Sequence, residues 1–176
     1  MLPTKSIYNR GAEDGAWMGL LFVAAVALQN LAQGSLVATL LADALLVAVP
    51  VVLWVMLRRS YRYDRLLTTF SGLWMHGIMI FLCGSLILGL AAFVYMRFIS
   101  PGFIYTQARL AVDLYSQIPE FETFAETLQK AIDRKLLPSP IMLSFTIIWL
   151  GSFSGAMLSM IEAGLIKAIV KKQTLN

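Results

Sequence analysis

Four long runs of apolar residues follow one another along the chain, separated by shorter polar stretches. They cover residues 16–32, 36–57, 72–96 and 141–166. A hydrocarbon core of about 30 Å is crossed by about 20 apolar residues in helical form, and each run is close to that length. The pattern predicts an all-α protein, an integral membrane four-helix bundle in which residues 1–176 form a single membrane domain.

A longer polar stretch, residues 100–140, separates the third and fourth apolar runs. Residues 103–117 have a helical pattern, and Pro119 suits the first turn of a second helix. In that second helix, apolar residues recur at spacings of three and four, which is typical of an amphipathic helix: Phe121, Phe124, Leu128 and Ile132. We expect a helical hairpin on the outer face that either lies on the membrane surface or binds the outer domain of a partner.

Composition and charge support a membrane protein. Hydrophobic residues make up 59% of the chain and charged residues 14%, against about 25% charged in a soluble domain, which excludes a soluble enzyme. The four apolar runs hold only two formally charged side chains, Asp43 and Glu162. Cys83 is the only cysteine, so the chain has neither an internal disulfide framework nor a zinc site built from several thiolates.

The basic residues predict the orientation of the chain. Nine lie in the N-terminal tail, the loop before the third run and the C-terminal tail, whereas the turn 33–35 has none. Residues 97–140 hold five basic and five acidic residues. Because basic loops resist translocation, both termini are expected to be cytoplasmic. The first run also resembles the core of a cleavable signal peptide, but its length favours a retained span.

Four arginines follow the second apolar run, interleaved with tyrosines: Arg58, Arg59, Arg62 and Arg65. A basic segment next to a membrane span sets orientation and attracts anionic lipid headgroups. Arginines and aromatic rings also alternate in nucleic-acid-binding proteins, but the position beside a span favours the lipid interpretation. The expected partner is therefore the bilayer, and no nucleic acid is expected.

Small residues recur at helical spacing in three of the runs. Such residues let helix backbones approach closely in a membrane. They either pack the protein's own four helices together or face a partner, which is another membrane protein or a second copy of this chain. The residues are Gly15, Gly19, Gly77, Gly84, Gly151, Gly155 and Ser159.

Three ionisable residues inside the runs are the candidate functional residues, because a charge in hydrocarbon is usually paired or functional. Asp43 is expected about 10 Å below the outer boundary. There it either forms a hydrogen bond with Gln29 or Asn30, or contacts a lipid, an ion or a partner. His76 and Glu162 are expected at one depth on antiparallel spans, where they either share a hydrogen bond or reach water separately.

Catalytic motifs are sparse. The segment 151–155 (GSFSG) is similar to a nucleophile elbow, but its serines occupy the second and fourth positions rather than the third. The sequence has one histidine, no HExxH motif, no phosphate-binding glycine loop and no dinucleotide fingerprint. We therefore expect no catalytic residues, no metal and no cofactor.

The layout resembles a known family. Two early spans joined by a tight turn precede a glycine-rich span that ends in residues 95–103 (YMRFISPGF), and a last span rich in small residues ends near two lysines. This arrangement resembles the bacterial family called domain of unknown function 4199. The resemblance implies an inner-membrane protein of Bacteroidota-type bacteria, encoded near a membrane glycosyltransferase, with an accessory role in envelope glycan or lipid-linked sugar synthesis. It implies no catalytic residue.

Two functional classes follow. The preferred hypothesis is a non-catalytic membrane subunit whose small-residue stripes and outer hairpin bind a larger membrane enzyme. The alternative is a small transporter or lipid-handling protein that uses Asp43, His76, Glu162 and a helix break at Pro50.

Overall fold

A computed structural model of the chain describes residues 6–31, 35–63 and 68–173. Arg65 of the four-arginine segment and residues 33–34 of the first turn lie outside the described residues. The described residues form six α-helices and contain no strand. The prediction of an all-α fold is therefore confirmed.

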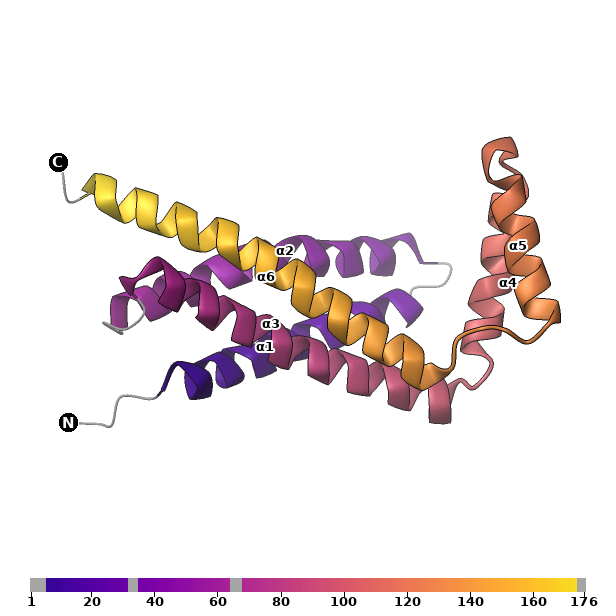
Figure 1. The fold of residues 1–176 in the computed structure, drawn as a ribbon, viewed down its shortest axis with the longest axis horizontal. Helices are drawn as coiled ribbons and strands as arrows, with labels where there is room; N and C mark the ends of the chain where they lie inside the picture. Colours follow the sequence, from indigo (N-terminus) through magenta and orange to yellow (C-terminus); the bar gives the residue numbers. More distant parts are fainter. Residues whose placement is uncertain (1–5, 32–34, 64–67, 174–176) are drawn as a thin grey trace. The chain divides into compact units, whose positions relative to one another are not determined.

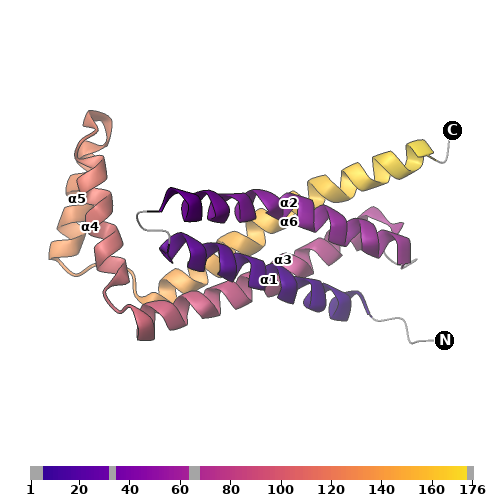
Figure 2. The same ribbon diagram turned by 180° about the vertical axis from the view of Figure 1, so that it is seen from behind.

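Four of these helices are long and apolar enough to cross a membrane. They are α1 (Ile7–Leu31), α2 (Leu36–Tyr63), α3 (Phe70–Val94) and α6 (Pro140–Gln173). The chain divides into two compact units, and the first comprises residues 1–89 and 147–176. Within this unit the beginning of α1 and the end of α6 lie at the same end, which we call the terminal end (Figures 1 and 2). A chain that crosses a membrane an even number of times also has its first and last spans ending on the same side.

The helices extend beyond the predicted apolar runs. The first begins at Ile7 instead of residue 16, the second continues to Tyr63, and the last reaches Gln173. A helix satisfies its own backbone hydrogen bonds outside the hydrocarbon as well as inside it. The helices therefore continue through the polar residues at the ends of the apolar runs. The second helix also continues through Pro50.

Glycines bring α1 and α3 into close contact. A Cβ atom added at Gly15 would lie 2.7 Å from Cβ of Cys83, and one at Gly19 would lie 2.8 Å from Cβ of Ile87. From the other side, a Cβ at Gly84 would lie 3.3 Å from the backbone nitrogen of Gly19. These backbones therefore approach more closely than any side chain would allow.

Small residues also join α3 to α6. Gly77 faces Ser159, whose Cβ would lie 2.5 Å from a Cβ added at the glycine, and Gly151 faces Ser85. Gly155 lies directly against the ring of Phe81. All seven small residues singled out from the sequence thus face another helix of their own bundle, which leaves none of them for the surface of a partner.

Apolar side chains complete the core of this unit. Leu53 and Leu57 of α2 pack with Leu73 of α3, and all three are fully buried. Trp74 of α3 donates a hydrogen bond from Nε1 to the carbonyl oxygen of Ala156 in α6, at 3.0 Å. In lipid, packing and such interhelical hydrogen bonds hold helices together, since the solvent itself is apolar.

The second unit, residues 90–146, contains the predicted helical hairpin. After a π-helical turn (Tyr95–Ile99), α4 (Phe103–Tyr115) and α5 (Glu122–Asp133) lie side by side (Figures 1 and 2). A 3₁₀ turn (Pro119–Phe121) connects them, and Pro119 occupies the first-turn position expected from the sequence.

The amphipathic face of the hairpin is only partly covered. Ile132 is buried between the helices, and the ring of Tyr115 contacts Phe121 and Phe124 at centroid distances of 5.4 and 5.3 Å. Phe121 and Phe124 are nevertheless 46% and 53% exposed. Apolar surface therefore remains on this unit.

Candidate functional site

His76 is the centre of a buried polar cluster that joins three helices. Its side chain is fully buried in α3. Nε2 of the ring lies 3.1 Å from Oδ2 of Asp14 in α1 and 3.1 Å from Oγ of Ser60 in α2. We call these three residues the histidine cluster. It lies near the terminal end, since each residue is close to the corresponding end of its helix.

The proton arrangement in the histidine cluster follows from the side-chain chemistry. A carboxylate only accepts hydrogen bonds, so Nε2–H of His76 donates to Oδ2 of Asp14. Oγ of Ser60 lies beside the same N–H as a second acceptor. Nδ1 of the ring is buried and has no hydrogen-bond partner among the described residues. In a nucleophile-activating triad, the serine and the carboxylate occupy different ring nitrogens. The cluster therefore joins helices and does not activate Ser60.

Sequence reasoning missed Asp14. Its position next to Glu13 and before the apolar run suggested a polar tail outside the membrane. A usable signal was present, however. Gly11, Gly15 and Gly19 form one helical stripe that contacts α3, and Asp14 lies beside that stripe. A residue at such a position points toward the neighbouring helix.

Glu162 lies in the same unit but does not pair with His76. The Glu162 side chain is 5% exposed, and its Oε2 has no hydrogen-bond partner among the described residues. Of the two alternatives given for this pair, the shared hydrogen bond is not formed, because the ring of His76 faces other helices. Nε2 contacts α1 and α2, and a Cβ added at Gly11 of α1 would lie 3.5 Å from Nδ1. His76 and Glu162 were expected at the same depth in the membrane, but residues at one depth need not contact each other.

Asp43 faces away from the bundle. It is exposed on α2, whereas the preceding residue, Ala42, is fully buried. The expected hydrogen bond with Gln29 or Asn30 is not formed, because Nδ2 of Asn30 donates to the carbonyl oxygen of Val26, at 2.8 Å. Asp43 makes no hydrogen bond or ion pair with another described residue.

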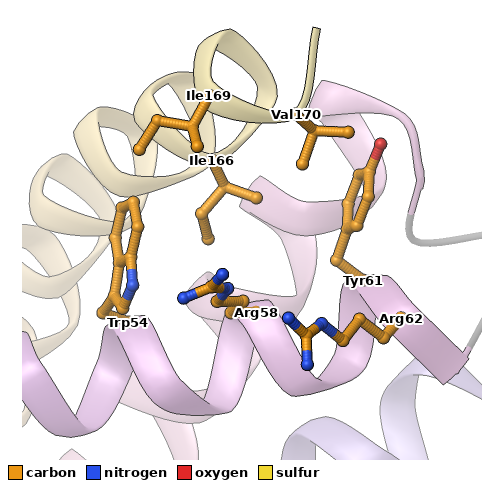
Figure 3. A pocket seen from close by; sticks show the side chains of 7 residues that line it. All are labelled: Trp54, Arg58, Tyr61, Arg62, Ile166, Ile169 and Val170. Carbon is orange, nitrogen blue, oxygen red and sulfur yellow. The ribbon is translucent and has the colours of Figure 1, made fainter. Parts of the chain in front are cut away.

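A pocket of about 260 Å³ lies between α2 and α6 near the terminal end (Figure 3). We call it the arginine pocket. From α2 it is lined by Trp54, Arg58, Tyr61 and Arg62, and from α6 by Ile166, Ile169 and Val170. Of the four arginines expected to contact anionic lipid, the pocket includes two. Arg59 is exposed and is not among the lining residues.

A second, more open hollow of about 420 Å³ lies deeper in the same unit. We call it the proline hollow, since Pro50 contributes to its wall. Its lining is mainly apolar and comes from all four helices of the unit: Phe22, Leu46, Val49, Pro50, Phe81, Ser85, Leu88, Gly151, Ser154, Gly155 and Leu158.

The three predicted ionisable residues do not form a common site. Neither the arginine pocket nor the proline hollow is lined by Asp43, His76 or Glu162. Within the described ranges, no group of three histidine, cysteine, aspartate or glutamate side chains is placed to hold a metal ion. The arrangement therefore comprises a closed histidine cluster, an outward-facing carboxyl and an arginine-lined pocket.

Comparison with known proteins gives one match. A protein-family model described as "Protein of unknown function (DUF4199)" matches residues 14–168, which is most of the chain. No curated protein and no solved structure matches. The matched range includes all three members of the histidine cluster, Asp43 and five of the seven residues that line the arginine pocket; Ile169 and Val170 lie just beyond it.

Proposed function

The chain belongs to the DUF4199 family, whose description names no activity, and from its structure we propose that it is a non-catalytic integral membrane subunit. It binds a larger membrane enzyme through the face of α2 around Asp43. The observation that carries this proposal is the outward orientation of Asp43 within a membrane-spanning helix.

Asp43 lies in an otherwise apolar stripe. Leu36, Leu40, Val47 and Val51 share its face at helical spacing, and all are 59 to 75% exposed. Lipid suits these four residues but not the carboxyl. An aspartate at the centre of a membrane helix costs about 3 kcal/mol for insertion, so such residues are usually paired or face a polar cavity. A polar group of another protein would provide the missing hydrogen bond.

A partner of different sequence fits this stripe better than a second copy of the chain. In a two-fold symmetric dimer the same surface meets itself, so the two Asp43 carboxyls would face each other. Two carboxyls at close range cannot both be ionised without repelling each other, so a symmetric contact is less favourable than one with a complementary group. A membrane helix with a cation or a hydrogen-bond donor at this depth would instead neutralise or satisfy the carboxyl.

The hairpin supplies a second contact surface in this proposal. Its exposed apolar residues include Leu110, Leu114, Phe121 and Phe124, and each is at least 46% exposed. A partner with an outer domain would cover them. The sequence resemblance further supports a glycosyltransferase of envelope glycan or lipid-linked sugar synthesis as the enzyme. The basic residues near the terminal end support cytoplasmic termini. The sequence resemblance supports the bacterial inner membrane as the location.

A transporter is the weaker candidate. It would need a continuous polar path, yet Asp43 faces outward while His76 and Glu162 are buried. None of the three lines either pocket. Pro50 contributes to the proline hollow, but the residues around it are mainly apolar.

Replacing Asp43 by leucine is expected to reduce the recovery of the partner at least about tenfold, which corresponds to about 1.4 kcal/mol. The full-length tagged chain is purified from its native cells in mild detergent, and the co-purified proteins are quantified by mass spectrometry. Val51→Leu is the matched control, because it changes the same stripe without removing a polar group, and it should retain the partner within about twofold.

Two results would contradict the proposal. In the first, the wild-type chain purifies without a stoichiometric partner, or only with further copies of itself. In the second, Asp43→Leu retains the partner as well as the wild type does. Asp43→Asn keeps a hydrogen-bonding side chain, and an intermediate recovery would indicate that the partner contributes a neutral donor.

A further inference from the structure

The arginine pocket lies where two membrane spans end. The apolar run of α2 ends at residue 57 and that of α6 ends at residue 166, and the residues that line the pocket lie on both sides of these limits. Because the ends of spans reach the headgroup region, the pocket lies at the depth of lipid phosphates. This position does not depend on the partner proposed for Asp43.

Two positive charges face this pocket. Arg58 and Arg62 lie one helical turn apart on α2, and Figure 3 shows both guanidinium groups directed along the pocket floor beneath α6. Neither arginine forms an ion pair with a carboxylate of the described residues. Two adjacent guanidinium groups without such a partner favour an anion, and their planar donors suit phosphate oxygens.

The remaining walls exclude a purely hydrophilic ligand. Ile166, Ile169 and Val170 of α6 form the opposite side of the pocket. Trp54 and Tyr61 flank the arginines, and rings of this kind prefer the boundary between hydrocarbon and headgroups. A free phosphate ion would leave the apolar walls in contact with water. An amphiphile would cover them.

The arginine pocket and the proline hollow both have walls formed by α2 and α6. Leu46, Pro50, Trp54, Arg58 and Arg62 follow one another at intervals of four residues on α2, and the first two line the proline hollow. Arg58 and Pro50 are eight residues apart, which is about 12 Å along a helix. A fatty acyl chain attached to a phosphate at Arg58 therefore reaches the proline hollow.

We propose that the arginine pocket binds the phosphate group of an anionic glycerophospholipid, and that one acyl chain of this lipid extends between α2 and α6 to the proline hollow. Basic pockets between membrane helices are suited to such headgroups. The ligand is a lipid of the surrounding bilayer, and the site holds it as a structural or regulatory component.

The test is lipid retention by the full-length chain, measured by native mass spectrometry after incubation with phosphatidylglycerol or phosphatidylcholine. The wild type should retain one phosphatidylglycerol in preference to phosphatidylcholine. The double variant R58Q/R62Q should bind phosphatidylglycerol at least about tenfold more weakly. R59Q is the matched control, because Arg59 is exposed on the same helix outside the pocket, and its binding should stay within about twofold of the wild type.

A second arm tests the acyl chain. Leu46→Trp places a larger side chain at the wall of the proline hollow without changing charge. It should weaken binding of dioleoyl phosphatidylglycerol at least about threefold and leave the dihexanoyl lipid unchanged. The substituted side chains are all at least partly exposed, so each variant should elute as a folded, monodisperse protein.

Three outcomes would overturn the proposal. Equal loss of binding in R59Q and R58Q/R62Q would indicate that the general positive charge of α2 attracts the lipid and that the pocket does not bind it specifically. Equal retention of phosphatidylcholine and phosphatidylglycerol would exclude a preference for a headgroup with net negative charge. Competition by free glycerol phosphate at the same concentration as the lipid would assign the pocket to a soluble anion.

Discussion

Replacing Gly155 by alanine is expected to lower the free energy of unfolding by about 2 to 3 kcal/mol, at the upper end of the usual cost of overpacking. The added methyl group would overlap Cγ, Cδ1 and Cβ of Phe81, which lie near the root of that side chain. Phe81 lines the proline hollow and its ring packs against Phe22 at 6.0 Å, but rotation of the ring into the hollow would not remove the overlap, because the overlap includes Cβ, which side-chain rotation does not move. Helices α3 and α6 would have to separate locally.

Gly164→Ala is the matched control on the same helix. Its added methyl group would lie 3.9 Å from the nearest atom, Cε2 of Phe70, which is an ordinary contact. The free energy of unfolding should therefore stay unchanged or rise by a few tenths of a kcal/mol, since alanine favours the helix. Stability is measured by titrating sodium dodecyl sulfate into the protein in mild micelles, with helicity as the signal. Equal losses at Gly155 and Gly164 would contradict this packing.

Asp14→Ala is expected to lower the free energy of unfolding by about 1 to 2 kcal/mol, because Nε2–H of His76 loses its carboxylate acceptor. His76 is fully buried, and Nε2 would retain only Ser60 among its described partners. The Asp14 side chain is itself 21% exposed, so in the variant water replaces part of the hydrogen bonding that the carboxylate provides to His76. The same unfolding titration measures the effect.

A double-mutant cycle identifies the partner of His76. The coupling between Asp14→Ala and His76→Ala should be about 1 to 2 kcal/mol, whereas the coupling between Glu162→Gln and His76→Ala should be within about 0.5 kcal/mol of zero. The second pair is the control, since Glu162 lies in the same unit without a hydrogen bond to the ring. A strong Glu162 coupling with a weak Asp14 coupling would contradict the histidine cluster.

Much of the fold was predictable because hydrocarbon imposes a length. The four apolar runs became four helices, and the polar stretch between the last two became the amphipathic hairpin. The ends were less predictable. The first helix continues beyond the apolar run and includes Asp14, which pairs with a histidine 62 positions away. The glycine stripe beside Asp14 indicates that this face meets another helix, but it does not indicate which residue Asp14 contacts.

The site was predictable in depth but not in direction. Counting residues placed His76 and Glu162 at one level, yet the rotation of each helix decides which neighbour a side chain meets, and the His76 ring is directed at α1 and α2. Rotation likewise directs Asp43 away from Asn30 and out of the bundle. Of the three arginines of this segment that the structure describes, Arg58 and Arg62 share the pocket, because they lie four residues apart while Arg59 is turned away.

Photo-crosslinking from α2 in the native cells tests whether the face around Asp43 binds another membrane protein. A photoreactive amino acid replaces Val47, which is 75% exposed one turn from Asp43, and in a control it replaces the buried Val49. We expect an adduct between position 47 and one other membrane protein, which disappears in Asp43→Leu and does not form from position 49. An absence of any protein adduct from position 47, or an adduct that Asp43→Leu leaves unchanged, would contradict this expectation.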